Sequence, residues 1–165
     1  MWLRNELQVP PLRFASVGMT NFSLREKGRR TMLDAKTIAV MTECSVGSVA
    51  GTLRFPQVVG KLIEAGVEAY HADLYRHEKT YYRPSGESHV VTESEFDSLK
   101  VADRFDQTGV RTAILEVQQG KIGYIAFMEQ IAAAGVAQYW VYLSGKKVDY
   151  VGRRGEVWVE WFPLP

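Results

Sequence analysis

Two short patterns of histidine and acid contain the residues with the most distinctive chemistry. His71 and Asp73 lie two positions apart, and Glu87 and His89 repeat this spacing in the reverse order. Side chains two apart on a strand point to the same face of a sheet, so two histidines and a carboxylate could converge on a divalent metal. Solvated polar residues on an open sheet face give the same pattern, which is the more common case.

The same histidine and acid also offer a possible catalytic pair. Asp73 could orient His71 as a general base. No serine or cysteine is placed by motif to serve as its nucleophile, so the pattern favours no catalysis. The alternative to a binding protein is therefore a small-molecule or metal-dependent enzyme that uses these polar residues.

A candidate pocket for a small ligand combines polar and aromatic side chains. Strand alternation predicts that one set of apolar residues faces the helices: Tyr70, Ala72 and Leu74 in the first half, and Tyr139, Val141 and Leu143 in the second. The opposite face then carries the polar residues His71 and Asp73 and the aromatic residues Trp140 and Tyr142. A pocket with one ionisable wall and one aromatic wall is typical of small-ligand sites. The ligand-binding candidates are His71, Asp73, Tyr81, Trp140 and Tyr142.

A candidate interface lies in the second half of the chain. Trp158 belongs to the closing strand-like run, and with Trp140 and Tyr142 it would form an exposed apolar patch. Such patches are suited to self-association, so we expect a homo-oligomer. Alternatively, a partner helix or the N-terminal segment covers the patch.

Tyrosines interleaved with cations raise the question of nucleic-acid binding. The cations fall at turns, where solvated lysine and arginine are expected in any case, and 20 basic residues against 19 acidic ones leave a net charge of +1. Nucleic-acid binding is therefore unlikely on this composition. The residues concerned are Tyr81, Tyr82 and Arg83 in one region and Lys146, Lys147, Tyr150, Arg153 and Arg154 in the other.

An internal repeat predicts the elements that position these residues. A shift of 69 positions aligns Ala65-Gly66-Val67 with Ala134-Gly135-Val136 without a gap. Each copy predicts one helix followed by a three-stranded antiparallel meander, and each helix ends at a glycine. Copy one spans about 54–92 and copy two about 123–161. The same shift pairs Phe55 with Tyr124, Leu62 with Ile131, Tyr70 with Tyr139, Leu74 with Leu143, Tyr81 with Tyr150, and Gly86-Glu87 with Gly155-Glu156.

Further elements surround the two copies. Residues 1–31 are predicted to be an N-terminal extension that could be disordered, and 32–165 to be a single duplicated α+β domain with helices packed on the sheet. Apolar spacing predicts a first helix from Leu33 to about Cys44, capped by Asp34, and a loop over Ser45 to Thr52. Residues 94–120 are predicted to form connecting helices, the first starting at the capping-box-like sequence Ser94 to Asp97. The sequence leaves open whether the meanders join into one sheet.

Composition narrows the environment of the protein. The 165 residues suit one domain with a real core. The only cysteine, Cys44, fits a reducing compartment, and no apolar run approaches the roughly 20 residues of a membrane-spanning helix. We therefore expect a cytoplasmic protein without a membrane partner.

Several strings of residues resemble one family. They are Gly66 to Leu74, Glu78 to Tyr82, Ala133 to Val136 and Gly152 to Pro163, and they are similar to the DUF1398 family, also labelled phage envelope protein-like. The likeness covers about Met32 to Pro163. It implies a bacterial, in part prophage-associated protein of unestablished function. It supplies no assigned catalytic or metal-binding residues to transfer, and the cofactor stays unknown. The sequence thus predicts a non-enzymatic binding or interaction module.

Overall fold

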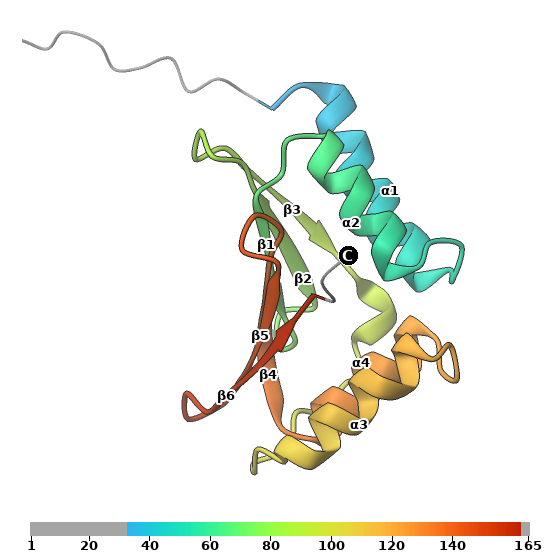
Figure 1. The fold of residues 1–165 in the computed structure, drawn as a ribbon, viewed down its shortest axis with the longest axis vertical. Helices are drawn as coiled ribbons and strands as arrows, with labels where there is room; N and C mark the ends of the chain where they lie inside the picture. Colours follow the sequence, from blue (N-terminus) through green and yellow to red (C-terminus); the bar gives the residue numbers. More distant parts are fainter. Residues whose placement is uncertain (1–32, 163–165) are drawn as a thin grey trace, which may run out of the picture.

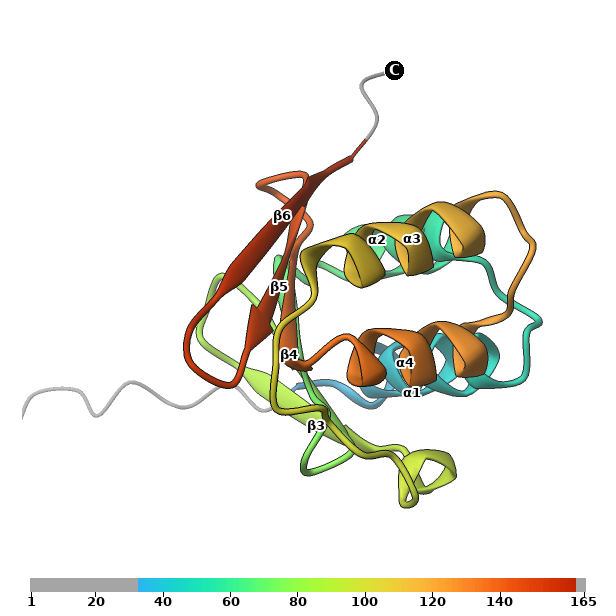
Figure 2. The same cartoon turned by 90° about the horizontal axis from the view of Figure 1, so that it is seen from below.

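The protein is an α+β structure with one sheet and one layer of helices (Figures 1 and 2). A computed structural model describes residues 33–162, which contain four α-helices and a six-stranded antiparallel sheet. The predicted N-terminal extension, residues 1–31, lies outside the described residues. Within the described range, each helix is too short or too polar to cross a membrane.

The sheet joins both halves of the chain through its two central strands. Its order is β3-β2-β1-β4-β5-β6, and the central pair β1 and β4 is antiparallel. The two sets of strands therefore form one sheet, the question that the sequence left open. The strands are β1 (Ala69–Asp73), β2 (Glu78–Tyr82), β3 (Ser88–Thr92), β4 (Val136–Tyr142), β5 (Lys147–Gly152) and β6 (Val157–Trp161).

All four helices cover the same face of the sheet, as Figure 2 shows. They interleave with the strands in the order two helices, three strands, two helices, three strands. A short 3₁₀ helix, η1 (Ser94–Phe96), follows β3 at the predicted capping box. The helices are α1 (Ala35–Val49), α2 (Phe55–Glu64), α3 (Gln107–Gln118) and α4 (Tyr124–Ala133).

Helix α1 is longer than its sequence predicts. The Asp34 cap is confirmed, since its Oδ1 accepts a hydrogen bond from the Thr37 backbone N–H at 2.8 Å. The loop predicted from Ser45 is wrong, because α1 continues to Val49. Gly47 does not end the helix but allows close packing: a Cβ there would lie 2.6 Å from the Leu53 side chain.

The bounds of the elements repeat at a fixed interval along the chain. Helices α2 and α4, and strands β3 and β6, begin and end 69 positions apart. The same interval separates His71 and Trp140, which face each other across the β1–β4 pair. This spacing is what an internal duplication predicts, and the evolutionary event itself stays a prediction.

The core lies between the helices and the inner face of the sheet. Leu62 of α2 and Ile131 of α4 are completely buried there, 69 positions apart. The inner face contributes rings that touch at centroid distances of 5.4 to 6.3 Å, an arrangement that adds aromatic contacts to apolar burial. These rings are Tyr70, Tyr81, Tyr139 and Tyr150.

Candidate functional site: the helix-free face of the sheet

The sheet has an outer face that no helix of the described chain covers (Figure 2). We define this outer face by strand register, starting from the opposed pair His71 and Trp140. Side chains across neighbouring strands share a face with their partners. Its members are Ser88, Val90 and Thr92 of β3; Glu78, Thr80 and Tyr82 of β2; Ala69, His71 and Asp73 of β1; Gln138, Trp140 and Tyr142 of β4; Lys147, Asp149 and Val151 of β5; and Val157, Val159 and Trp161 of β6.

An aromatic cluster of Tyr82, Trp140, Tyr142 and His71 lies at the centre of the outer face. The Trp140 ring stacks with Tyr82 at 5.6 Å and with Tyr142 at 5.9 Å between centroids, and the His71 ring lies 4.6 Å away. The small side chain of Ala69, opposite both Tyr82 and Tyr142, leaves room for the indole. All four rings are half-buried, so they can still contact a partner.

A groove of about 550 Å³ runs beside this cluster between two hairpin turns. The Arg83–Gly86 turn of β2–β3 bounds one side, and Ser144 and Gly145 of the β4–β5 turn bound the other. Tyr82, Trp140 and Tyr142 line the groove, with Glu68 and Lys147 as further charged lining residues. Its size falls in the range of small-ligand sites.

The polar side chains of the outer face are mostly engaged with one another. His71 Nε2 lies 2.7 Å from Gln138 Oε1. Lys147 Nζ bonds Asp149 Oδ2 at 2.8 Å and sits 5.0 Å from the Tyr142 ring centre. Asp149 Oδ1 is buried without a hydrogen-bond partner. The face thus presents aromatic surface edged by polar groups that are paired with one another, apart from the one Asp149 oxygen.

Asp73 does not orient His71 as a general base. Its Oδ1 accepts the backbone N–H groups of Tyr75 and Arg76 at 2.9 and 3.0 Å, which closes the β1–β2 turn. His71 is instead held by Gln138. The two side chains share the outer face without forming the predicted pair.

The four residues of the predicted metal site do not converge. His89 pairs with Tyr81 on the inner face, whereas His71 and Asp73 lie on the outer face. Glu87 belongs to the β2–β3 turn, where it bonds Arg83 and Ser85. No group of three potential ligands with metal-binding geometry occurs in residues 33–162. The pattern failed because it did not fix the register of β3 against β2.

Two further predicted site residues lie on the other side of the sheet. Tyr81 is 1% exposed and belongs to the core, so it cannot line a pocket with Trp140. Trp158 pairs with Tyr150 on the inner face and packs against the core. The predicted patch therefore loses Trp158, and the outer-face residues of β6 are Val157, Val159 and Trp161 instead.

The tyrosine and cation group is divided in the same way. Tyr82 and Lys147 are outer-face residues, whereas Tyr150 is buried on the inner face. Arg83 is paired with Glu87 at 3.3 Å, and Arg153 is paired with Asp103. Lys146 and Arg154 are exposed residues of the turns.

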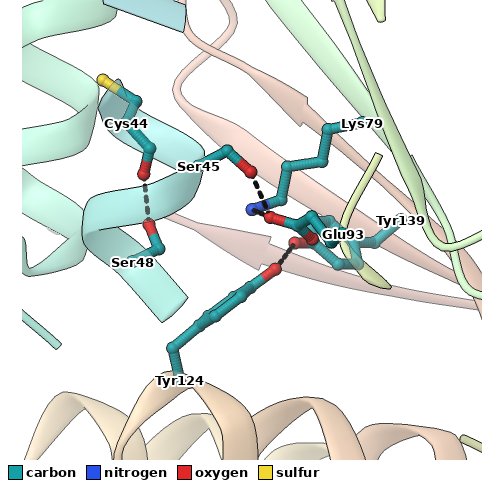
Figure 3. A network of polar contacts seen from close by, with 7 residues as sticks. All are labelled: Cys44, Ser45, Ser48, Lys79, Glu93, Tyr124 and Tyr139. Atoms are coloured by element: carbon teal, nitrogen blue, oxygen red, sulfur yellow. Dashed lines mark hydrogen bonds and ion pairs between the residues drawn. The ribbon is translucent and has the colours of Figure 1, made fainter. Parts of the chain in front are cut away.

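A buried polar network between the layers was not predicted from the sequence (Figure 3). Lys79 Nζ of β2 bonds Glu93 Oε1 at 2.7 Å, and both side chains are 4% exposed. Ser45 of α1 donates to the same carboxylate oxygen. The ammonium lies 4.4 Å from the centre of the Tyr124 ring, whose hydroxyl bonds that of Tyr139 at 3.0 Å.

Burial changes the acidity of this network. Desolvation lowers the pKa of Lys79, and the adjacent Glu93 partly opposes the shift. Desolvation also raises the pKa of the buried tyrosines well above the usual range, with Glu93 or Glu160 adding to the effect. The network is closed to solvent, so it holds α1 and β2 together rather than offering a site.

Fold and surface together define a two-layer α+β protein in which residues 33–162 leave one aromatic sheet face without a covering helix. Within that class, the chain belongs to the DUF1398 family, described as a protein of unknown function, whose family model matches residues 46–160. The predicted family membership is therefore confirmed. A search of curated proteins found no match.

Proposed function

We propose that this protein is a non-enzymatic interaction module that associates with a second copy of itself through the outer face. The aromatic cluster carries the proposal, because stacked rings at the centre of a helix-free face remain half-exposed. Exposed aromatic patches of this kind typically bind another protein surface. The single cysteine fits a reducing compartment and supports a cytoplasmic location for this module.

The composition of the outer face supports a covered surface. Strands with one solvated face usually place polar residues on that face. The charged residues on the outer face here are only Asp73, Glu78, Lys147 and Asp149. Apolar side chains extend to both edge strands and are well exposed. Val90 of β3 is 47% exposed, Val157 of β6 is 53% exposed and Trp161 of β6 is 67% exposed.

The size of the face also suits a second copy. The backbone of six strands of about five residues spans a flat area of roughly 500 Å². The side chains that project from it increase the accessible surface. A standard interface takes about 800 Å² from each partner, and paired sheets pack about 10 Å apart. A twofold contact places the same patch on both partners, so it favours a surface without a large excess of one charge. On this face Lys147 is paired with Asp149, and Glu78 is paired with Arg76.

A matched pair of arginine substitutions tests this proposal. Val157 on the outer face and Ile63 on α2 are both 53% exposed, so Val157→Arg and Ile63→Arg add the same charge at equal exposure. We expect Val157→Arg to lower the association constant at least about tenfold, because it places an uncompensated charge in the interface. Sedimentation velocity over a concentration series measures the effect.

The control and a second variant complete the test. Ile63→Arg should associate like the wild type, and Thr80→Arg, beside His71 at the centre of the face, should act like Val157→Arg. Circular dichroism checks that each variant is folded. A wild-type protein that is monomeric at all concentrations, or equal association by all three variants, contradicts the proposal.

A further inference from the structure

The groove beside the aromatic cluster has the lining of a site for an extended, proline-containing segment. Three rings line one small groove and stack within 5.9 Å of their neighbours. Aromatic-lined grooves bind polyproline II segments, whose backbone is extended before binding and loses little entropy. An acidic side chain in the groove would add a charge-assisted hydrogen bond to a segment that also carries a basic residue.

We infer that the occupant of this groove is the chain's own segment Val9 to Arg13, with the sequence Val-Pro-Pro-Leu-Arg. Proline fixes its own φ near −65° and disfavours the helical region for the residue before it. Val9, Pro10 and Pro11 are therefore biased toward polyproline II by their sequence alone. The inference rests on the proposed function, because the segment would occupy part of the association surface.

Charge complementarity supports this occupant. Glu68 lines the groove, and among residues 33–162 it forms none of the ion pairs. Arg13 lies two positions after Pro11, so its guanidinium can reach beyond the ring contacts to that carboxylate. The two cations of the groove, Arg83 and Lys147, are already paired with Glu87 and Asp149.

The connection is long enough for binding within one chain. Helix α1 begins at the same end of the molecule as the β2–β3 turn that borders the groove (Figure 1). About 20 residues from Arg13 to Leu33 span up to roughly 66 Å when extended. The six strands together measure only about 25 Å across. A segment in the groove would compete with the second copy for Trp140 and thereby weaken self-association.

The indole N–H signal of Trp140 in a ¹H–¹⁵N spectrum tests the contact directly. The comparison uses the full chain carrying Val157→Arg, at a protein concentration where sedimentation shows it to be monomeric, with and without the three substitutions Pro10→Ala, Pro11→Ala and Arg13→Glu. Val157 lies outside the groove lining. We expect the Trp140 signal to shift between the two and the inner-face Trp158 signal to stay in place. A synthetic peptide of residues 6–16 should move the signal of the substituted chain back.

The C-terminal prolines supply the matched control. Phe162, the last described residue, packs against Phe55 of α2 with 5.5 Å between ring centroids, away from the groove. Pro163→Ala with Pro165→Ala should therefore leave the Trp140 signal unchanged. An unchanged Trp140 signal in the chain with the three segment substitutions, or no response of that chain to the peptide, overturns the inference.

The two proposals fail separately. In chains that keep Val157, the protein with the three segment substitutions should self-associate at a several-fold lower concentration than the wild-type protein. If both chains stay monomeric, the proposed function fails, and the Trp140 signals still decide whether the segment binds. If both associate equally, the competition is wrong while self-association stands.

Discussion

Lys79 shows how differently the two halves of the chain fill equivalent positions. Its ion pair with Glu93 is almost completely buried, and a buried pair is stable only when each charge keeps its partner. The residues 69 positions later are Val148 and Phe162, both apolar. One half thus places a charged contact where the other half places hydrophobic packing.

We predict that Lys79→Met destabilises the protein by about 3–5 kcal/mol, because it leaves the Glu93 carboxylate buried without its cation. The double variant Lys79→Met with Glu93→Leu should recover most of this loss. Urea unfolding followed by circular dichroism measures both. A double variant no more stable than the single one would falsify the view that the uncompensated charge is the cause.

The buried tyrosines predict a loss of stability in alkali. Burial raises the pKa of these phenols in the folded protein, whereas in the unfolded chain they ionise near pH 10. The folded state therefore binds more protons above that pH, so its stability is complete below pH 10 and falls as pH rises. The residues are Tyr70, Tyr81, Tyr124, Tyr139 and Tyr150.

Two spectroscopic signals check this prediction. As the pH rises, the phenolate absorbance of the buried tyrosines should appear together with the loss of ellipticity, not before it. Tyr70→Phe should reduce the slope of stability against pH, since it removes one of the groups concerned. Phenolate formation by all tyrosines in the still-folded protein would rule out the proposed linkage.

At this scale the sequence predicted the faces of β1 and β4 correctly, but it misplaced Tyr81, His89 and Trp158 and did not predict the interior contacts. Alternation along β1 and β4 correctly separates Tyr70 from His71 and Tyr139 from Trp140. The same alternation places Lys79 on the inner face with Tyr81, which is a signal for a buried cation. Its partner Glu93 follows the end of β3, so no periodicity could identify the pair.

At the scale of elements, the ends of α2 and α4 differ although both have a glycine at the same position. Gly66 and Gly135 have φ values of +75° and +83°, where an L side chain is strained. A Cβ on Gly66 meets only the flexible Arg83 side chain at 3.3 Å. A Cβ on Gly135 would lie 2.2 Å from the backbone oxygen of Arg104.

These surroundings predict unequal effects of the same substitution. Gly66→Ala should cost about 1–2 kcal/mol from the left-handed conformation alone. Gly135→Ala should cost about 1–3 kcal/mol more, because rigid backbone must move. Urea midpoints of the two variants give the comparison, and equal losses would mean that the chain around Arg104 yields easily.

Which elements exist was more predictable from sequence than how they meet. The helices ending at Gly66 and Gly135 follow from local signals and lie close to their predicted places. The face that each β3 or β6 residue takes depends on the length of the turn before the strand, because a change of register by one residue reverses the face. This is why His89 and Trp158 were assigned to the wrong side.

At the scale of the whole molecule, the four helices cover one face of the sheet and leave the other face accessible to a binding partner. The outer face combines the aromatic cluster, the groove and the exposed edge residue Trp161. Self-association and binding of the Val9 to Arg13 segment would use overlapping parts of it. The protein could then adjust its association by the occupancy of one groove, without any change in the packed core.

The central β1–β4 pairing also bears on how the chain is made. The hairpins within each half pair strands that are close together in the sequence. His71 of β1, in contrast, can pair with Trp140 of β4 only after a further 69 residues have been synthesised. At 5–20 residues per second, a ribosome takes roughly 3–14 s to supply that partner. During this time β1 has an unpaired edge in the middle of the future sheet, where a foreign strand could bind. A chaperone, or rapid burial of β1 beneath α1 and α2, would be most useful in that interval.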